Sequence, residues 1–271
     1  MRISAKKSLG QNFLIDQNIR NKIIAALELK KDDVVLEIGP GRGELTQAIA
    51  QRANKVFGLE IDKRLSSLLS STFADAAKNV EIANKDILKL DIAKFLKENK
   101  IRGRIKVFGN IPYYISSPII AHLLKFRERL ETIFITVQKE FAARVAAVPG
   151  SKAYGSFSCF TQYYTSPRII FNISRNCFKP APKVDSSFLE LKIRKEPAVC
   201  VKDEGLFFRI IRGAFNQRRK TLRNSLSNIV SERELHSFFE KSGIARGVRP
   251  ESLTLENFAF LTNLQYLSKI T

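Results

Sequence analysis

Short apolar runs alternate with amphipathic stretches along the first two thirds of the chain. Apolar runs of this length are typical of buried strands, whereas apolar residues repeated every three or four positions are typical of helices. A helix capped by Asp16 comes first. The pattern then predicts strands at residues 34–38, 55–60, 80–83, 105–108 and 133–137, separated by helices at 44–53, 63–73, 87–98 and 118–126. This alternation indicates the α/β class, with a doubly wound, mostly parallel sheet.

The pattern changes twice toward the carboxyl end. Strand-like runs at residues 168–172 and 187–193 have no convincing helix between them, so we expect an antiparallel pair that closes one edge of the sheet. From about residue 204 the strand signal stops and helical periodicity continues to the end. We therefore expect two domains, an α/β domain over residues 1–200 and a small all-helical domain over residues 201–271.

Charge narrows the choice of partner. The 271 residues contain 46 Lys and Arg against 26 Asp and Glu, a net charge of +20. A basic surface of this size attracts a polyanion, and nucleic acid is the first candidate. An anionic membrane is the alternative, but we find no basic amphipathic helix ending in bulky aromatics and no apolar run of ~20 residues. The start of the chain lacks a signal-peptide pattern, so we expect a cytoplasmic protein.

Cysteine and histidine do not suggest metal chemistry. Cys159, Cys177 and Cys200 are 18 and 23 residues apart, which fits neither a metal knuckle nor a disulfide framework, and we expect free thiols. His122 and His236 stand alone, so we expect structural or surface roles for them and no metal site.

The ends of the predicted strands carry the candidate chemistry, because ligands of doubly wound sheets bind outside the carboxyl ends of the strands. The loop Glu37-Ile38-Gly39-Pro40-Gly41-Arg42-Gly43 follows the first strand. Its spacing is G-x-G-x-G, whereas dinucleotide sites use G-x-G-x-x-G, and Glu44 would face a pyrophosphate. A dinucleotide cofactor is therefore disfavoured.

Acidic residues follow the next two strands. Glu60 lies 21 residues after Gly39, where a carboxylate can accept both hydroxyls of a ribose, and Asp86 follows the third strand, where it can meet an adenine amino group. Taken singly, each feature has a structural alternative, since glycines serve turns and strand-end acids cap helices. Together they favour a nucleoside cofactor without phosphates, S-adenosylmethionine. The cofactor-binding residues predicted at these strand ends are Glu37, Gly39, Gly41, Glu60, Ile61, Asp86 and Ile87.

The fourth strand ends in Asn110-Ile111-Pro112-Tyr113, which contains neither a strong nucleophile nor a base. This composition suits an adenine amine, whose lone pair is delocalised into the ring. The Asn110 side-chain oxygen and the Ile111 carbonyl could accept its two N–H bonds and orient the nitrogen. Pro112 would stiffen the loop, and Tyr113 would stack on the base with ~1–3 kcal/mol. The structural alternative is a strand-end turn with a packed tyrosine.

Five motifs in this order resemble those of KsgA-type rRNA adenine N6,N6-dimethyltransferases, which are relatives of the Erm methylases. They lie at residues 7–14, 37–43, 110–113, 178–186 and 215–222 and cover nearly the whole chain. The resemblance implies a Rossmann-like S-adenosylmethionine methyltransferase fold, with catalysis in residues 1–200 and rRNA binding in the helical residues 201–271.

The resemblance also implies roles that the residues alone do not reveal. Asn12 and Leu14, with Gln11 of the same motif and with Asn110, would bind the cofactor, and the first two would help to close over its methionine part. Phe178 would lie on the opposite face of the target adenine from Tyr113, completing an aromatic clamp around a flipped base. Tyr114 stands where many relatives have a smaller polar residue, which could alter the fit of the base.

The helical domain carries the expected RNA contacts. Residues 205–231 contain six Lys or Arg and no acid, and we expect Arg218, Arg219, Lys220 and Arg223 to bind RNA; a solvated helix face is the alternative. The run 216–220 resembles KsgA-type enzymes more than Erm methylases. The implied substrate is therefore a pair of adjacent adenosines in the loop of the last helix of small-subunit rRNA, each receiving two methyl groups.

Two other functions remain open from the sequence. One is Erm-like methylation of large-subunit rRNA, and the other is a non-catalytic ribosome-assembly or nucleic-acid-binding factor. The expected partner is small-subunit rRNA or a pre-small-subunit particle, with no membrane or metal partner. We expect a monomer, since no coiled-coil heptad or exposed apolar stripe calls for a partner chain.

Overall fold

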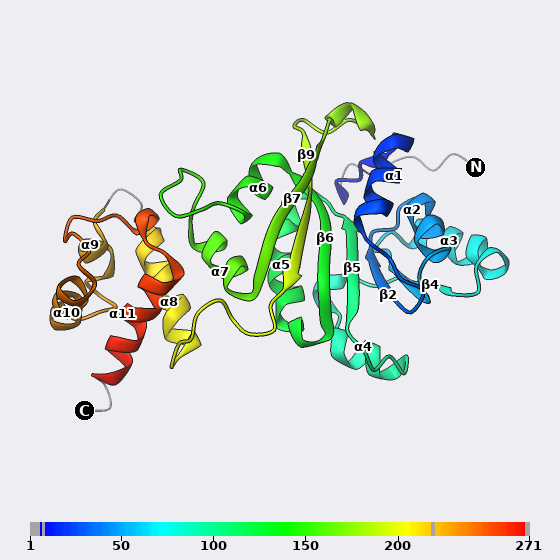
Figure 1. Cartoon of the computed structure of the whole chain (residues 1–271). Coiled ribbons are helices and arrows are strands. Elements are labelled where there is room, and N and C mark those ends of the chain that lie inside the picture. The colour runs from blue at the N-terminus through cyan, green and yellow to red at the C-terminus, as the bar shows by residue number, and fades with distance from the viewer. Residues whose placement is uncertain (1–5, 7–8, 218–219, 269–271) are drawn as a thin grey trace. The chain divides into compact units, whose positions relative to one another are not determined.

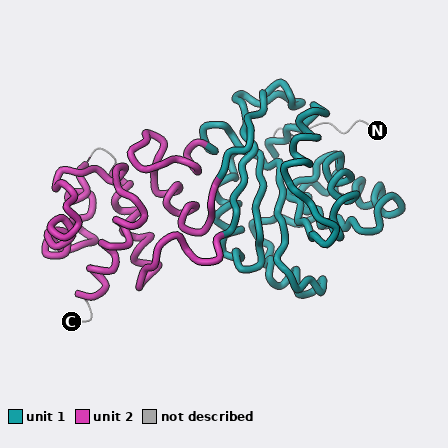
Figure 2. The backbone as a smooth tube through the Cα atoms, viewed as in Figure 1, with its two compact units in different colours: residues 1–142, 168–193 teal, residues 143–167, 194–271 magenta. Residues whose placement is uncertain are grey.

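The computed structural model describes Lys6, residues 9–217 and residues 220–268 (Figure 1). Figure 2 shows two compact units: residues up to 142 with 168–193, and residues 143–167 with those from 194 onward. This division differs from the predicted boundary at residue 200. The chain leaves the first unit after residue 142 and returns to it at residue 168, and a departure of this kind has no signature in local periodicity.

The first unit is built on a seven-stranded sheet with the order β4-β3-β2-β5-β6-β9-β7. The predicted mostly parallel sheet is confirmed, because β4, β3, β2, β5 and β6 pair in parallel, while β9 is antiparallel to β6. The strands are β2 (Val34–Ile38), β3 (Lys55–Leu59), β4 (Val80–Ala83), β5 (Ile105–Asn110), β6 (Leu130–Gln138), β7 (Thr165–Ile173) and β9 (Ser186–Ile193).

The predicted pair at one edge of the sheet is also confirmed, since β9 and β7 are neighbours there. The Arg168 guanidinium forms an ion pair with Glu190, at 2.8 Å, and the Ser187 hydroxyl donates to Asn172 Oδ1, at 2.7 Å. Asn172, near the end of β7, thus contacts Ser187, near the start of β9, and this is the order expected of antiparallel neighbours.

Strand order places a switch point between β2 and β5. From β2 the chain runs outward through β3 and β4, then crosses to β5 on the other side of β2. Ile38 at the end of β2 is opposite both Leu59 of β3 and Gly109 of β5. The carboxyl ends of three strands therefore meet at one edge, and the loops that follow them converge.

Among the described residues, five α-helices lie wholly within the first unit, and an aspartate caps three of them. They are α1 (Gln17–Ala26), α2 (Glu44–Ala50), α3 (Lys63–Ala76), α4 (Ile92–Glu98) and α5 (Ser116–Lys125). Asp16, Asp62 and Asp91 each accept a backbone N–H from the first turn of α1, α3 and α4. Ile23 of α1 packs with Phe108 and Phe188 of the sheet in the hydrophobic core. Each such buried side chain contributes roughly 1.5–3 kcal/mol to stability.

Two short strands were not predicted. β1 (Phe13–Leu14) pairs antiparallel with β8 (Phe178–Lys179), and Leu14 is opposite Phe178. A two-residue strand has no periodicity, so only the folded chain reveals that the amino-terminal motif lies against the motif at residues 178–186.

The second unit is helical, as expected for its carboxyl-terminal part. It contains α8 (Glu204–Asn216), α9 (Leu222–Leu226), α10 (Glu232–Ser242) and α11 (Leu255–Leu267), together with the unpredicted α7 (Ser156–Tyr164). Ring contacts join α7 to α8, with centroids 5.0 Å apart for Tyr163 and Phe207 and 5.5 Å apart for Phe160 and Phe208. The remaining helix, α6 (Lys139–Val145), spans the boundary between the units. None of the helices in the described ranges is long and apolar enough to cross a membrane.

Gly43, at the start of α2, offers a test of the local packing. Its φ is +81°, and a Cβ placed there would lie 2.7 Å from Leu69 Cδ2 in α3. We expect Gly43→Ala to lower the free energy of unfolding by about 2–6 kcal/mol, since backbone strain and overpacking each cost about 1–3 kcal/mol. Urea denaturation measures this loss. Gly103→Ala is the control, because a Cβ there meets nothing within 4 Å; equal losses for the two variants would contradict the packing argument.

Candidate cofactor and substrate site

A cavity lies at the carboxyl ends of β2, β3 and β5, where the strand-end loops meet the amino-terminal segment. The structure brings to it every residue predicted to bind the cofactor, together with the tetrapeptide after β5. These lining residues are Gln11, Asn12, Leu14, Glu37, Gly39, Gly41, Glu60, Ile61, Asp86, Ile87, Asn110, Ile111, Pro112 and Tyr113.

The glycine-rich loop needs glycine for two reasons. Gly39, Gly41 and Gly43 all have positive φ, which side chains other than glycine rarely adopt. A Cβ on Gly41 would lie 3.2 Å from the Phe13 ring, so it would crowd the side of the loop that lines the cavity. Gly43 instead packs against α3. The loop thus keeps backbone at the cavity wall, where a ligand can approach it closely.

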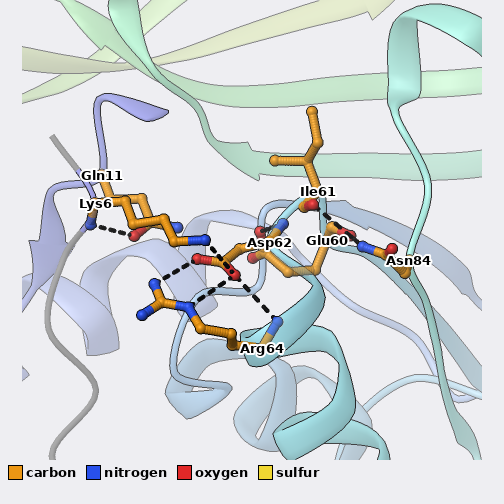
Figure 3. A network of polar contacts seen from close by, with 7 residues as sticks. All are labelled: Lys6, Gln11, Glu60, Ile61, Asp62, Arg64 and Asn84. Atoms are coloured by element: carbon orange, nitrogen blue, oxygen red, sulfur yellow. Dashed lines mark hydrogen bonds and ion pairs between the residues drawn. The ribbon is translucent and has the colours of Figure 1, made fainter. Parts of the chain in front are cut away.

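The Glu60 carboxylate organises the ends of β2 and β3. It is buried, and its Oε2 accepts the Gly41 N–H at 3.2 Å. Its Oε1 accepts the Asp62 N–H at 2.9 Å (Figure 3). Burial raises the pKa of Glu60 above its ordinary value, and the two backbone bonds partly offset this rise. Each carboxylate oxygen has a second lone pair, so Glu60 can still accept hydroxyl groups from a ligand in the cavity.

Asp62 is a structural residue that the sequence reading missed. Its buried carboxylate accepts the Arg64 N–H and forms ion pairs with Arg64 at 2.9 Å and Lys6 at 3.2 Å, as Figure 3 shows. Hydrogen bonds from Arg64 and Lys6 hold the pKa of Asp62 well below its usual range. The Lys6 N–H in turn donates to Gln11 Oε1 at 2.8 Å. The sequence did contain a signal for this residue: Asp62 directly precedes the predicted helix of residues 63–73, which is the position of a helix cap.

The end of β4 completes the same wall. Asn84 Nδ2 donates to the Glu60 carbonyl at 2.7 Å and to the Ile61 carbonyl at 3.2 Å, which ties the loops after β3 and β4 together. Asp86 Oδ1 caps a short 3-10 helix, η2 (Ile87–Lys89), by accepting the Leu88 N–H at 3.0 Å. Ile61 lines the cavity with 55% of its surface exposed. This wall therefore offers an apolar face beside hydrogen-bond acceptors.

Asn110 is oriented by the amino-terminal segment. Its Nδ2 donates to the Asn12 carbonyl at 3.2 Å, and Asn12 Nδ2 donates to the Gly10 carbonyl at 3.3 Å. Because the amide nitrogen of Asn110 is bonded on that side, Oδ1 is the atom available to accept hydrogen bonds. Pro112 has a φ of −59°, and its carbonyl accepts the Ile115 N–H at 3.2 Å. The tetrapeptide is thus braced on both sides of the Ile111 carbonyl.

The two tyrosines of the loop differ in their surroundings. The Tyr113 hydroxyl lies 2.5 Å from Ser186 Oγ, and burial raises the pKa of this phenol. Tyr114 also lines the cavity but is 67% exposed, with its ring 3.2 Å from the position of a Cβ on Gly10. Tyr114 therefore lies at the rim of the cavity, and Tyr113 is held deeper.

Phe178 is a buried residue of the hydrophobic core. Its ring is 3% exposed and packs in the hydrophobic core with Leu14 and Phe188, and it does not line the cavity. The pairing of Leu14 with Phe178 in the β1–β8 ladder accounts for this position. The clamp with Tyr113 stays a prediction.

Of the residues predicted to bind RNA, Arg218 and Arg219 lie outside the described residues. Lys220 is exposed in the segment between α8 and α9. Arg223 is also exposed, but its guanidinium forms an ion pair with Glu232 at 3.0 Å. Lys220 is therefore available to bind an RNA phosphate. Arg223 must first give up its ion pair with Glu232 before it can bind one.

Glu37 is the most unusual ionisable group of the site. It is fully buried, its Oε2 has no hydrogen-bond partner among the described residues, and burial raises its pKa to about 7. The Thr46 hydroxyl lowers this pKa and the Glu60 charge raises it further, both by less than burial. A buried acceptor without a partner is costly, so it is suited to a positively charged or hydrogen-bond-donating group of a ligand.

The residues that the structure describes include no group of three His, Cys, Asp or Glu residues placed to bind a metal ion. The switch point, the glycine loop and the acids at the ends of β2, β3 and β4 define a Rossmann-like methyltransferase, whose cofactor is S-adenosylmethionine. The family model described as "Ribosomal RNA adenine dimethylase" matches residues 2–266. The chain belongs to this family.

Individual relatives agree with this assignment. The chain is 45% identical to "Ribosomal RNA small subunit methyltransferase A" of Lachnoclostridium phytofermentans, over 96% of this chain and 91% of that protein. A protein of the same name from Caldanaerobacter subterraneus is 42% identical over 98% of each chain. Two crystal structures each reach a TM-score of 0.75. The 23S rRNA methyltransferase ErmE is 27% identical, covering 94% of this chain and 100% of that one, and a Plasmodium falciparum dimethyladenosine transferase is 25% identical, covering 92% and 95%.

The buried Glu37 predicts a pH-dependent stability. Because its pKa is raised from 4.5 to about 7 in the folded protein, its contribution to stability is complete below pH 4.5 and is lost as the pH rises through about 7. Glu37→Gln removes this dependence. In cofactor-free protein, we expect the free energy of unfolding of the variant relative to wild type to rise by about 3 kcal/mol between pH 4.5 and pH 8, at ~1.4 kcal/mol per pKa unit.

Urea denaturation at several pH values measures this difference. Glu131→Gln, which neutralises an exposed carboxylate of β6, is the control and should leave the difference independent of pH. A Glu37→Gln difference that stays constant, or falls as the pH rises, would contradict the assigned effect of burial.

Proposed function

We propose that this chain transfers methyl groups from S-adenosylmethionine to the N6 amines of two adjacent adenosines in the 3′-terminal hairpin loop of small-subunit rRNA during ribosome biogenesis. Each adenosine receives two methyl groups. The geometry at Asn110 carries the proposal, because its Oδ1 is left as an acceptor beside the Ile111 carbonyl in the same cavity as the strand-end acids. The relatives named as small-subunit enzymes are 41–45% identical and ErmE is 27% identical, which favours the small subunit over the Erm-like alternative.

The cavity residues suit this cofactor, which supplies an electrophilic methyl group on a sulfonium sulfur. Glu60 would accept the two ribose hydroxyls, Asp86 would accept from the adenine amino group, and Ile61 would pack on the adenine ring. Gly41 leaves backbone room at the cavity wall, and the partnerless Oε2 of Glu37 would receive a donor from the methionine part. Asn12 and Leu14 would close over that part from the amino-terminal side.

The chain has little chemistry to perform beyond alignment of the amine. Asn110 Oδ1 and the Ile111 carbonyl would accept its two N–H bonds, which localises the lone pair and aims it at the methyl group. Tyr113 would stack on the adenine, held in place by its own hydroxyl contact. For Phe178 to reach the opposite face of the base, its ring must leave the core cluster that now surrounds it.

The remaining proposals concern context. Residues 1–200 would act as the catalytic domain and residues 201–271 as the rRNA-binding domain, with Lys220, Arg223, Arg218 and Arg219 on RNA phosphates. The substrate would be the rRNA of a pre-small-subunit particle, met by a monomer in the cytoplasm. The net charge of +20 supports a phosphate-rich partner.

Asn110→Ala tests the proposed chemistry. Wild-type protein incubated with methyl-labelled S-adenosylmethionine and unmethylated small subunits should produce dimethyladenosine at two adjacent positions. We expect kcat of the variant to fall by at least about 100-fold, because a preorganised acceptor acts mainly in the transition state. Primer extension and nucleoside analysis locate the product, and single-turnover kinetics give the rate.

Large subunits serve as the control substrate and should remain unmodified. Cofactor affinity, measured by calorimetry, shows whether the variant retains the cavity. An Asn110→Ala protein that binds the cofactor and keeps the wild-type rate would remove the proposed mechanism, and label found in large-subunit RNA would favour the Erm-like alternative.

Lys220→Ala tests the RNA contact. We expect weaker binding to an rRNA fragment that contains the hairpin, and a decrease of ~1 in the slope of log Kd against log salt concentration, as for one lost phosphate contact. Arg223→Ala should have a smaller effect because Glu232 already pairs with it. Filter binding at several salt concentrations measures both.

Lys97→Ala removes the same charge from an exposed position in α4 and provides the control. Equal changes in slope for Lys97→Ala and Lys220→Ala would show a general charge effect and no specific phosphate contact at Lys220.

A further inference from the structure

The hydroxyl pair of Tyr113 and Ser186 joins two motifs that are far apart in the sequence. Tyr113 lies in the loop after β5, and Ser186, 73 residues later, is the first residue of β9. Their oxygens are 2.5 Å apart; Ser186 is completely buried and Tyr113 is half-buried. A hydrogen bond at the far end of a tyrosine side chain restricts the tilt and swing of the whole ring.

Ser186 is a fixed point on the framework of the fold. It is paired with Gln138 in the antiparallel β6–β9 ladder. The preceding residue, Asp185, accepts the Lys139 N–H through its carbonyl and the Arg175 N–H through Oδ1, each at 3.0 Å. The backbone at Ser186 is therefore held from both sides, and its hydroxyl presents a rigid anchor to Tyr113.

Tyr113 lies on a short element. It begins a single turn of 3-10 helix, η3 (Tyr113–Ile115), which follows Pro112. The next residue, Tyr114, points to the rim of the cavity and is 67% exposed. Phe178 is in the core and does not line the cavity. The hydroxyl contact with Ser186 links the Tyr113 ring to a strand of the sheet.

We propose that Ser186 is a positioning residue for methyl transfer, whose hydroxyl holds the Tyr113 ring in the orientation that stacks on the target adenine and aims its amine at Asn110. The inference rests on the proposed function. Burial raises the pKa of the Tyr113 phenol, so the hydroxyl stays protonated and the bond persists at neutral pH. A loosened ring misaligns the amine, which lowers the rate of transfer more than the affinity for RNA.

Removing the bond from either end tests the proposal. Ser186→Ala and Tyr113→Phe should each lower kcat on the order of tenfold, with less than about a twofold change in KM for unmethylated small subunits, because alignment acts in the transition state. The double variant should be no slower than either single variant, since both substitutions remove one interaction. Cofactor affinity, measured by calorimetry, should stay at the wild-type value in all three.

Ser187→Ala is the matched control. Ser187 is the next residue of β9, is equally buried, and donates to Asn172 Oδ1 at 2.7 Å instead of contacting Tyr113. This variant loses a comparable hydrogen bond, worth about 1 kcal/mol of stability, but should keep the wild-type kcat.

A readout without turnover uses rRNA with 2-aminopurine at the target position, whose fluorescence is quenched when an aromatic ring stacks on it. We expect less quenching with Ser186→Ala and Tyr113→Phe than with wild type or Ser187→Ala. Any of three results would overturn the inference. The rate losses of the two single variants could multiply in the double variant, Ser187→Ala could lose as much rate as Ser186→Ala, or Ser186→Ala could leave the quenching unchanged. If Ser186→Ala fails to fold, Tyr113→Phe at wild-type kcat overturns it as well. A wild-type protein that does not methylate small subunits would overturn the proposed function instead.

Discussion

The parallel register of β2 with both of its neighbours is the constraint on which the site depends. Ile38 faces Leu59 on one side and Gly109 on the other, so three strands end at the same level. Parallel strands require crossover connections, and the reversal of strand order at β2 leaves their loops facing a shared space. Glu60 then joins two of those loops by accepting the Gly41 and Asp62 N–H groups. Shifting β2 against either neighbour would separate the groups that line the cavity.

Contacts between segments that are far apart in the sequence add further walls to the cavity at the ends of these strands. The Lys6–Asp62 ion pair and the bond from Asn110 to the Asn12 carbonyl hold the amino-terminal segment against the strand ends. The β1–β8 ladder fastens the same segment to the motif at residues 178–186, which also supplies Ser186 to Tyr113. The amino-terminal motif and the late motif therefore act on one cavity although more than 160 residues separate them.

The site concentrates negative charge within a strongly basic protein. Glu37 and Glu60 are both buried beside the cavity, and burial raises the pKa of each. A buried carboxylate oxygen without a partner, such as Glu37 Oε2, destabilises the cofactor-free protein. A ligand with hydroxyl and ammonium groups would supply those partners, so the same residues that weaken the empty fold favour the cofactor. Basic residues outside the cavity would attract a polyanion, and such attraction needs no burial.

The sequence by itself determined the order of strands and helices and the class of cofactor, because both depend on local signals. Buried strands are short apolar runs, and the ends of parallel strands are where loops carry glycines and acids. These signals led to the choice of Glu37, Glu60, Asp86 and Asn110 as candidate cofactor-binding residues, and all four line the cavity. Tertiary structure alone decided the anchoring of Tyr113 by Ser186, the burial of Phe178, and the grouping of residues 143–167 with the helical unit. Each of these depends on contacts between residues far apart in the chain, and such contacts leave no periodic trace in the segments they join.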